Sequence, residues 1–392
     1  HYFSVLFLCD FFNTFETSNS IFLNFNMYIV FISIFIGLLY CFLVLVFVVG
    51  WRRIPLFEPN KCVDLHSGLS VSVVIACKNE ENNLPKLLSC LQIQSYQNFE
   101  LILVNDHSTD ATLSVMKAAQ SLFANVKVID AEMCGKKNAL KEGIMSASGS
   151  LIITTDADCM PGYDWLMVIC SFQQTQPSDL IICPVQLAAG ESLFLRLQAL
   201  EFNMLIASGA GAAGAGMPIL CNGADLAFTK EAWMQSRHDL VDEQMSGDDI
   251  FLLQSIKKRG GVIRFLKSES AIVFTQPANT LTAFFKQRRR WASKSPAYTD
   301  MQLIFTACIV FAISFWMLIL VFSSLFYPSL LAVFFYIFGA KFIADIIFVY
   351  VIRSFFKEKR LWFHSFLLSI IYPFYIVSVA VSALAFQNKS WK

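Results

Sequence analysis

The stretch VSVVIACKNE, residues 71–80, joins an apolar run rich in valine and isoleucine to three polar residues. Val71–Cys77 therefore predicts a β-strand. Similar runs recur about every 25–30 residues, with helical patterns between them; they are Phe99–Val104, Val126–Ile129, Leu151–Thr155 and Leu180–Val185. This alternation is typical of βαβ units, so the sequence predicts an α/β domain with a mostly parallel sheet.

Polar residues follow three of these predicted strands directly. They are Lys78-Asn79-Glu80, Asn105-Asp106 and Asp156-Ala157-Asp158. Ligands of open parallel sheets bind beyond the carboxyl ends of the strands. We therefore expect the three groups to converge on one cleft. The phosphate-binding pattern GxxxxGK[ST] is absent from the sequence, which disfavours a P-loop enzyme.

The composition indicates that part of the chain lies in lipid. Hydrophobic residues make up 56% of the 392 residues and charged residues only 15%, against an average of about 25% charged residues in globular domains. The net charge of +1 creates no global field that would attract nucleic acid. The 11 cysteines form no CxxC pair, so we expect reduced thiols rather than a disulfide scaffold or a metal–thiolate site.

The first predicted transmembrane helix is 28–50, an uncharged stretch followed at once by Trp51-Arg52-Arg53. Arginine next to a span marks its cytosolic end. We therefore expect residues 1–27 to form an extracytoplasmic extension. Since Met27 directly precedes the span, we also expect that residues 1–26 are not native.

Three more spans are predicted near the C-terminus, at 301–327, 329–352 and 361–387. Tyr327-Pro328-Ser329 is the turn between the first two, and a basic loop at 353–360 separates the last two. Following the chain through the spans places residues 52–300 and the basic loop in the cytosol. Lys341 and Asp345 lie inside a span, either as a functional pair or as charges that neutralise each other one helical turn apart.

Residues 190–216 form an amphipathic helix pattern that fits the membrane surface or the face of the sheet. The small-residue stretch SGAGAAGAGMP, 208–218, predicts a loop that is mobile or closely packed.

The clearest chemical signal is TTDADCM, 154–160, where two carboxylates flank a small residue at a predicted strand end. Carboxylate oxygens suit a hard divalent cation that also takes phosphate oxygens. SGDDIFLL, 246–253, places Asp248 and Asp249 at the start of a predicted helix. One aspartate is enough to cap a helix, so the second favours a role as general base.

These segments together resemble family 2 glycosyltransferases of the membrane-bound branch, which have a GT-A fold. The resemblance covers residues 68–295 and rests on motifs in the family's order; they are VSVVIACKNEENNL, LILVNDHSTDAT, GKKNAL, TTDADC, CNGADLAF, SGDDIFLL and QRRRW. It implies a Rossmann-like, mostly parallel cytosolic domain with one N-terminal and three C-terminal transmembrane helices.

The resemblance also implies site residues. Nucleotide-sugar binding falls to Glu80, Asp106, Lys136, Asp156, Gln287, Arg290 and Trp291, and the metal (Mg²⁺ or Mn²⁺) to Asp158 with Asp156. Asp249 matches the catalytic base, with Asp248 beside it, while Asn222, Gly223 and Asp225 line the acceptor side. In QRRRW, 287–291, we expect Arg288 and Arg289 to serve only as a positively charged membrane anchor.

We therefore interpret the chain as an inverting, metal-dependent glycosyltransferase of the bacterial inner membrane, with a cytoplasmic catalytic domain. The implied donor is a nucleotide-diphospho sugar linked to UDP, and the acceptor is a lipid or a membrane-associated glycan. Two alternatives stay open: a processive polysaccharide synthase, which QxxRW favours, and a non-catalytic nucleotide-sensing or scaffold protein. Four predicted spans leave little material for a polymer channel in a monomer, which favours the addition of single sugars.

Overall fold

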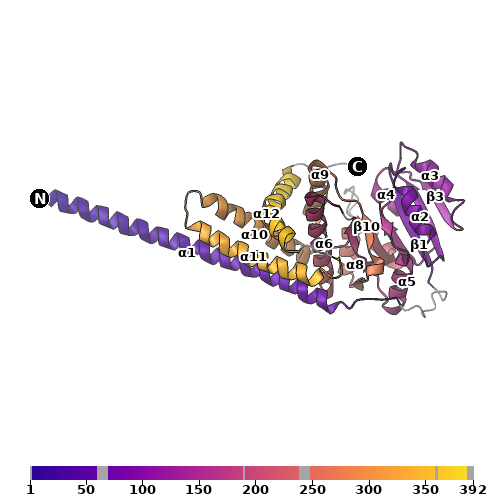
Figure 1. Ribbon diagram of the computed structural model, residues 1–392, viewed down its shortest axis with the longest axis horizontal. Helices are drawn as coiled ribbons and strands as arrows, with labels where there is room; N and C mark the ends of the chain where they lie inside the picture. Colours follow the sequence, from indigo (N-terminus) through magenta and orange to yellow (C-terminus); the bar gives the residue numbers. More distant parts are fainter. Residues whose placement is uncertain (1, 60–68, 189, 238–247, 358–360, 386–392) are drawn as a thin grey trace.

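The computed structural model describes residues 2–59, 69–188, 190–237, 248–357 and 361–385. A sheet domain lies at one end and a bundle of long helices at the other (Figure 1). The helices are α1 Tyr2–Arg53, α2 Leu84–Gln92, α3 Thr112–Ala119, α4 Lys136–Ser146, α5 Trp165–Thr175, α6 Leu193–Gly214, α7 Lys230–Ser236, α8 Asp248–Lys258, α9 Leu281–Ala292, α10 Met301–Ser323, α11 Leu330–Ile352 and α12 Leu361–Ala385.

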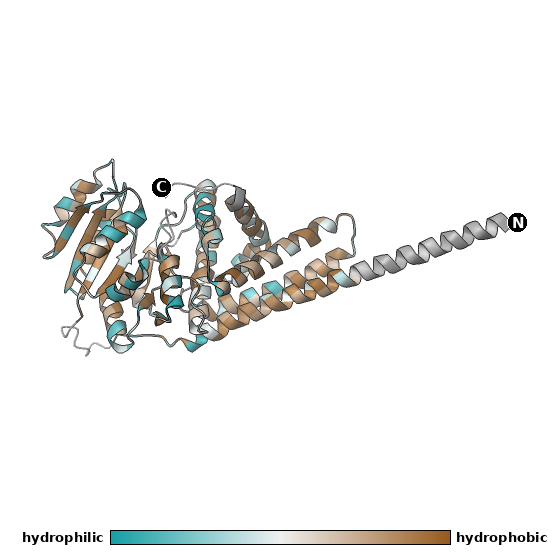
Figure 2. Ribbon diagram, turned by 180° about the vertical axis from the view of Figure 1, so that it is seen from behind, coloured by the Kyte–Doolittle hydropathy of each residue, from teal (hydrophilic) through white to brown (hydrophobic). Residues whose placement is uncertain are grey.

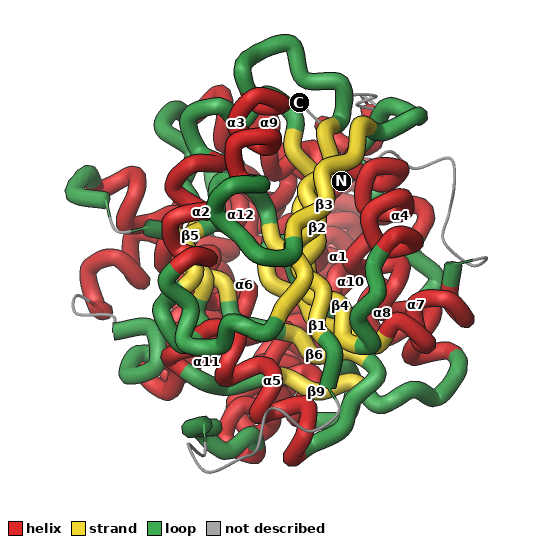
Figure 3. Tube along the Cα trace, turned by 90° about the vertical axis from the view of Figure 1, so that its right-hand side faces the viewer, coloured by secondary structure: helices red, strands yellow, loops and turns green. Residues whose placement is uncertain are grey.

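The main sheet has the strand order β3-β2-β1-β4-β8-β6-β9 (Figure 3). Its strands are β1 Val71–Cys77, β2 Phe99–Asn105, β3 Val126–Asp130, β4 Leu151–Thr155, β6 Leu180–Ile182, β8 Asp225–Thr229 and β9 Ile263–Phe265. The first four strands along the chain pair in parallel, whereas β8 runs antiparallel to both of its neighbours. The prediction of a mostly parallel α/β sheet is thus confirmed.

Helices cover both faces of this sheet. As a result, β1 is buried along its whole length. Val73 and Ile75 pack on one face with residues of α2 and α5, whereas Val74 and Ala76 face the opposite core with α4, α7 and α8. Alternate residues of a strand point to opposite faces, so a nearly continuous apolar run satisfies both cores. Because helices cover both faces of the sheet, polar side chains are accommodated at the ends of the strands.

The predicted strand Leu180–Val185 is in fact two strands in different sheets. β6 ends at Ile182, and β7 Val185–Leu187 joins a small sheet with β5 Met160–Pro161 and β10 Val273–Thr275. Pro184 lies between β6 and β7, and proline lacks the N–H that a continuing strand would donate.

The stretch 208–218 is largely helical, so the prediction of a loop there is wrong. Gly209, Gly211 and Gly214 lie within α6. A Cβ on Gly211 would lie 2.4 Å from the Phe47 carbonyl oxygen of α1, and a Cβ on Gly214 would lie 2.2 Å from that of Gly50. The glycines therefore let the backbones of α1 and α6 approach closely. Their spacing matches the pattern GxGxxG, but a dinucleotide-binding motif of this pattern follows a strand, whereas these glycines lie inside a helix.

Among the described residues, four helices are long and apolar enough to cross a bilayer, as their hydrophobic colouring in Figure 2 illustrates. The spans are Met27–Arg53, Met301–Ser323, Leu330–Ile352 and Trp362–Ala383. Each overlaps a predicted span, although the first of the C-terminal three ends before the predicted turn. Residues 386 and 387 of the last prediction lie outside the described residues. Between this bundle and the sheet, α6 and α9 run crosswise to the long helices (Figure 1).

Lys341 and Asp345 form a buried ion pair of 2.5 Å on α11. The Tyr40 hydroxyl of α1 donates to the other carboxylate oxygen of Asp345 at 2.5 Å. The Lys341 ammonium also lies over the rings of Tyr40 and Tyr372, 5.1 and 5.0 Å from their centroids. The described structure therefore favours mutual neutralisation, with the pair linking α1, α11 and α12.

Substitution Lys341→Met should destabilise the helix bundle, because it leaves the Asp345 carboxylate buried without its cation. Breaking one side of a buried pair costs about 3–5 kcal/mol, whereas replacing both partners by apolar residues is close to neutral. We expect a lower Tm in detergent for Lys341→Met and a Tm near wild type for Lys341→Met with Asp345→Leu. Lys357→Met is the control, because Lys357 pairs with Glu269 at the surface. An unchanged Tm for the single Lys341 variant would contradict the neutralisation.

Candidate active site

Two of the predicted motifs meet at the edge where β4 ends and β8 begins. Thr155 of β4 and Asp225 of β8 are paired in the antiparallel register. The Thr155 hydroxyl donates to the Ala224 carbonyl at 2.9 Å, and the Ala224 amide donates to the Asn222 side chain at 3.1 Å. The strand pairing thus brings 154–159 and 221–228 together, although 60 or more residues separate them in the chain.

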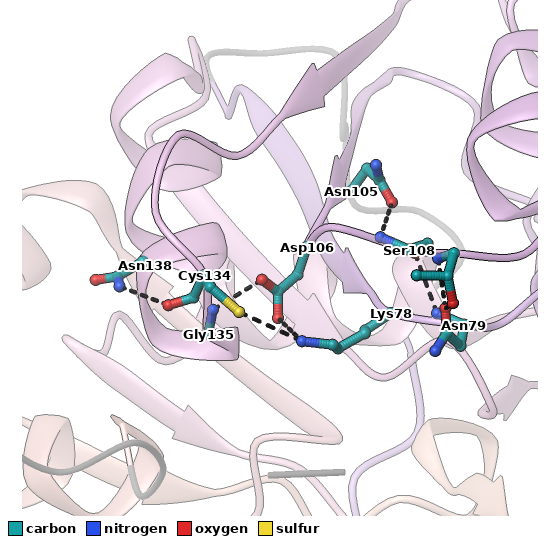
Figure 4. Close-up of polar contacts among 9 residues, drawn as sticks. Lys78, Asn79, Asn105, Asp106, Ser108, Cys134, Gly135 and Asn138 are labelled. Atoms are coloured by element: carbon teal, nitrogen blue, oxygen red, sulfur yellow. Dashed lines mark hydrogen bonds and ion pairs between the residues drawn. The ribbon is translucent and has the colours of Figure 1, made fainter. Parts of the chain in front are cut away.

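Lys136 lies in the first turn of α4 and forms an ion pair with Asp156 at the end of β4. Its position depends on Gly135, whose φ of 117° is a conformation that favours glycine. The Gly135 amide donates to the buried Asp106 carboxylate at 2.7 Å, and Lys78 approaches the other oxygen of Asp106 at 3.7 Å (Figure 4). In this structure Asp106 therefore holds the loop that presents Lys136.

Asp158 lies two residues beyond Asp156 in a crowded acidic environment. Burial raises the pKa of Asp158 to about 6, and the carboxylates of Asp156 and Glu80 add to that shift. Glu80 is itself buried and accepts a hydrogen bond from Asn83 at 2.8 Å. Closely spaced carboxylates repel one another, and a cation between them relieves the repulsion.

The donor set fits a divalent metal ion bound together with a diphosphate. Among the described residues no three His, Cys, Asp or Glu side chains form a group that could hold a metal. Mg²⁺ is often held by only one or two carboxylates and completes its shell with water and substrate phosphate oxygens. Asp158 and Asp156 would supply the protein's share.

Asp249 lies in the first turn of α8, as predicted, and faces Gly223. One carboxylate oxygen accepts from the Gly223 amide at 2.9 Å, and the other accepts from the Ile250 amide at 2.9 Å. The Asp249 charge acts on Lys136, because both it and Asp156 help to raise the pKa of that ammonium against the effect of burial. The side chain of Asp248 lies outside the described part of the structure.

Helix α9 carries Gln287, Arg290 and Trp291, all of them half-buried. The charge of Arg290 opposes the upward shift of the Lys136 pKa, which places the two cations in one electrostatic neighbourhood. The structure therefore brings Arg290 into the group formed by Lys136, Asp156 and Asp249. The Trp291 ring lies against Phe202 of α6, with the two ring planes tilted by 42° and the centroids 6.3 Å apart.

Arg288 is not an anchor at the membrane edge, so that part of the prediction is wrong. It is 3% exposed and forms an ion pair with Glu201 of α6. Its guanidinium lies 4.3 Å from the centroid of the Trp291 ring. Tyr375 of α12 donates to the same glutamate at 3.4 Å. Glu201 thus joins α6 to α9 and α12. Arg288 supports the tryptophan, because helical residues three apart are neighbours.

Asp225 does not face the acceptor side in this structure. Its side chain is fully buried and accepts a hydrogen bond from the Trp165 indole at 3.0 Å. Burial raises the pKa of Asp225 well above its usual range. The alternation of β8 explains the placement, since the strand begins at this residue and turns its side chain towards α5.

Sequence reasoning missed Tyr298, a half-buried phenol on which the charge of Asp249 acts. Burial raises the pKa of the Tyr298 phenol, and the charge of Asp249 adds to that shift. No motif marks Tyr298, because it follows α9 in a short turn before α10.

Residues 72–231 match the model of glycosyl transferase family 2, so this part of the chain is a family 2 glycosyltransferase domain. A mannosyltransferase from Pyrobaculum calidifontis, solved with GDP-Man and Mn²⁺, shares the fold with a TM-score of 0.53. The two proteins are 16% identical, and the match covers 92% of this chain and 98% of that one. The predicted GT-A fold is thereby confirmed.

Two curated relatives are similar to parts of the chain. Poly-beta-1,6-N-acetyl-D-glucosamine synthase of Staphylococcus aureus is 26% identical over 237 residues, which are 60% of this chain and 56% of the relative. Undecaprenyl-phosphate 4-deoxy-4-formamido-L-arabinose transferase of Proteus mirabilis is 40% identical over 95 residues, 22% of this chain and 28% of the relative. The matched segment thus spans little more than half of the first relative and less than a third of the second.

Proposed function

We propose that the protein transfers a sugar from a nucleotide-diphospho sugar to a lipid acceptor, with inversion at the anomeric carbon. The observation that carries this proposal is the ion pair of Lys136 with Asp156 just beyond β4. Asp158 follows two residues later, and the charges of Asp249 and Arg290 act on Lys136. Such a transfer needs acidic groups that bind a metal and cations that bind the diphosphate. It also needs a separate carboxylate that acts as the base.

The cationic side of the site serves the leaving group. As the bond between the anomeric carbon and the diphosphate oxygen breaks, negative charge develops on the nucleoside diphosphate. Lys136 and Arg290 stabilise that charge, because fixed cations in a partly buried site act strongly on charge formed in the transition state. A divalent metal held by Asp156 and Asp158 supplies further charge neutralisation when bound. We assign Glu80 and Asp106 to the binding of the nucleotide, which is uridine in this proposal.

The Asp249 carboxylate serves the acceptor. It takes the proton of the acceptor hydroxyl as the acceptor oxygen forms its bond to the anomeric carbon. Attack from the face opposite the leaving group inverts the configuration. Gly223 lies beside this carboxylate, and its amide fixes the orientation of the carboxylate. We assign the preceding residue, Asn222, to the same acceptor side.

A second candidate is a processive polysaccharide synthase, since the matched synthase of Staphylococcus aureus shares the larger segment with this chain. Single addition to a lipid remains our first proposal, because the four candidate spans of the described residues leave little room between them for a polymer channel. We also propose that the catalytic domain faces the cytoplasm of a bacterial cell, because Arg52 and Arg53 follow the first span.

The proposal is tested with full-length protein in membranes, a panel of nucleotide-diphospho sugars, and Mn²⁺ or Mg²⁺. We expect nucleotide release from at least one donor, and complete loss of release after chelation with EDTA. Asp158→Asn should raise the metal concentration for half-maximal rate at least about tenfold. Absence of release with every donor and both metals would overturn the enzyme assignment and favour a sensor or scaffold. Release that survives EDTA unchanged would overturn the metal site alone.

A further inference from the structure

A cavity of about 630 Å³ lies within the helix bundle, bordered by α1, α6, α10, α11 and α12. Its wall is mostly apolar and includes Leu43, Phe47, Met204, Val310, Ile376 and Ala380. Cavities of this size are large enough to enclose most of a drug-sized ligand. None of the candidate site residues that the structure describes in the sheet domain lines this cavity.

The charged groups in the wall are already partnered within the protein. Lys341 pairs with Asp345, which also accepts from Tyr40, and Glu201 pairs with Arg288. The charges of these side chains are therefore satisfied within the protein, and the cavity is lined mainly by aromatic rings and aliphatic carbon. A polysaccharide would place many hydroxyls against this wall, and each hydroxyl without a partner would cost free energy. An apolar chain has no such cost.

Part of the cavity wall comes from residues next to the segments of the candidate active site. Ala292, Ser295 and Tyr298 line it directly after the QRRRW motif, and Ile219 and Leu220 line it directly before Cys221. The charge of Asp249 acts on both Tyr298 and Cys221. The cavity thus reaches the neighbourhood of the carboxylate that we propose as the base.

The cavity wall also includes an exposed residue of a candidate membrane span. Cys308 of α10 lines it and is nevertheless exposed. Because α10 is one of the candidate spans, exposed surface at Cys308 faces lipid if the helix crosses the membrane. A hydrophobic molecule can therefore enter from the side without passing through water.

We propose that this cavity binds the hydrocarbon chain of the acceptor lipid, which enters past Cys308 and leaves the acceptor's hydroxyl head group beside Asp249 and Tyr298. This inference rests on the proposed function, and it names what the acceptor must carry. The substrate class is an amphiphile with an extended apolar chain, and a free soluble glycan lacks the part that the cavity recognises.

The test narrows the cavity with Ala380→Phe on α12 and compares it with Val381→Phe. Ala380 lines the cavity, whereas its neighbour Val381 is 57% exposed and lies outside the lining. The full chain in membranes receives a labelled donor that the wild type uses, together with total lipid extract, and product is counted in the organic phase. We expect Ala380→Phe to lower lipid-linked product at least tenfold and Val381→Phe to stay within twofold of wild type.

Affinity for the released nucleotide, together with Tm, reports whether each variant is folded. If Ala380→Phe is unfolded, Val310→Phe on α10 narrows the cavity from another helix and decides the matter. Wild-type product in a folded cavity variant, or wild-type label found only in a water-soluble polymer, would overturn the inference. Failure of the proposed function looks different, because the wild type would then release no nucleotide from any donor.

Discussion

Asp249→Asn is expected to lower the rate of sugar transfer about 10³-fold while leaving the protein folded. Asparagine keeps an oxygen that can accept from the Gly223 amide, so the local geometry is retained. It cannot take a proton from the acceptor, and a positioned base contributes roughly 10²–10⁴-fold. The measurement is initial transfer rate with the wild-type donor, together with nucleotide affinity and Tm.

Asp179→Asn is the matched control for this substitution. The Asp179 carboxylate also accepts from a backbone amide, that of Val262 at 2.7 Å, but it lies on the far side of the sheet domain from the strand ends that carry the site. We expect its transfer rate within twofold of wild type. A transfer rate for Asp249→Asn as high as that of the control would show that another group acts as base.

The fold was predictable because its strands are apolar runs at regular spacing. Both faces of β1 are covered, so hydrophobicity alone marks Val71–Cys77 in the sequence. The site was partly predictable for a related reason, since the ends of parallel strands share one edge. That rule places Asp156 near Glu80 and Asp106 without any knowledge of the helices.

Features that depend on contacts distant in the chain were not predictable. The glycines of α6 look like loop residues locally, and only the approach of α1 makes them favourable in a helix. Arg288 looks like a membrane anchor, and its burial depends on Glu201, 87 residues earlier. The cavity depends on how α6 packs against α1, α10, α11 and α12. The sequence predicts each of these four long helices as an apolar segment, but it does not predict how they pack.

Consecutive arginines on α9 should respond differently to substitution, because a helix turns each of them towards a different environment. Arg290→Ala should lower the transfer rate about 10²–10³-fold with little change in Tm, as expected for the loss of one group that stabilises transition-state charge. Arg289→Ala is the control, and we expect its rate within about threefold of wild type.

Arg288→Met should act through stability instead. It leaves Glu201 buried without its cation, at a cost of about 3–5 kcal/mol, and removes the guanidinium beneath Trp291. Adding Glu201→Leu should recover most of the Tm, since the pair is then replaced by apolar side chains, but it cannot restore the support of Trp291. We therefore expect the double variant to be folded and still slow. A double variant with the wild-type transfer rate would show that Arg288 serves only to neutralise Glu201. A wild-type Tm for Arg288→Met alone would show that the ion pair with Glu201 does not stabilise the protein.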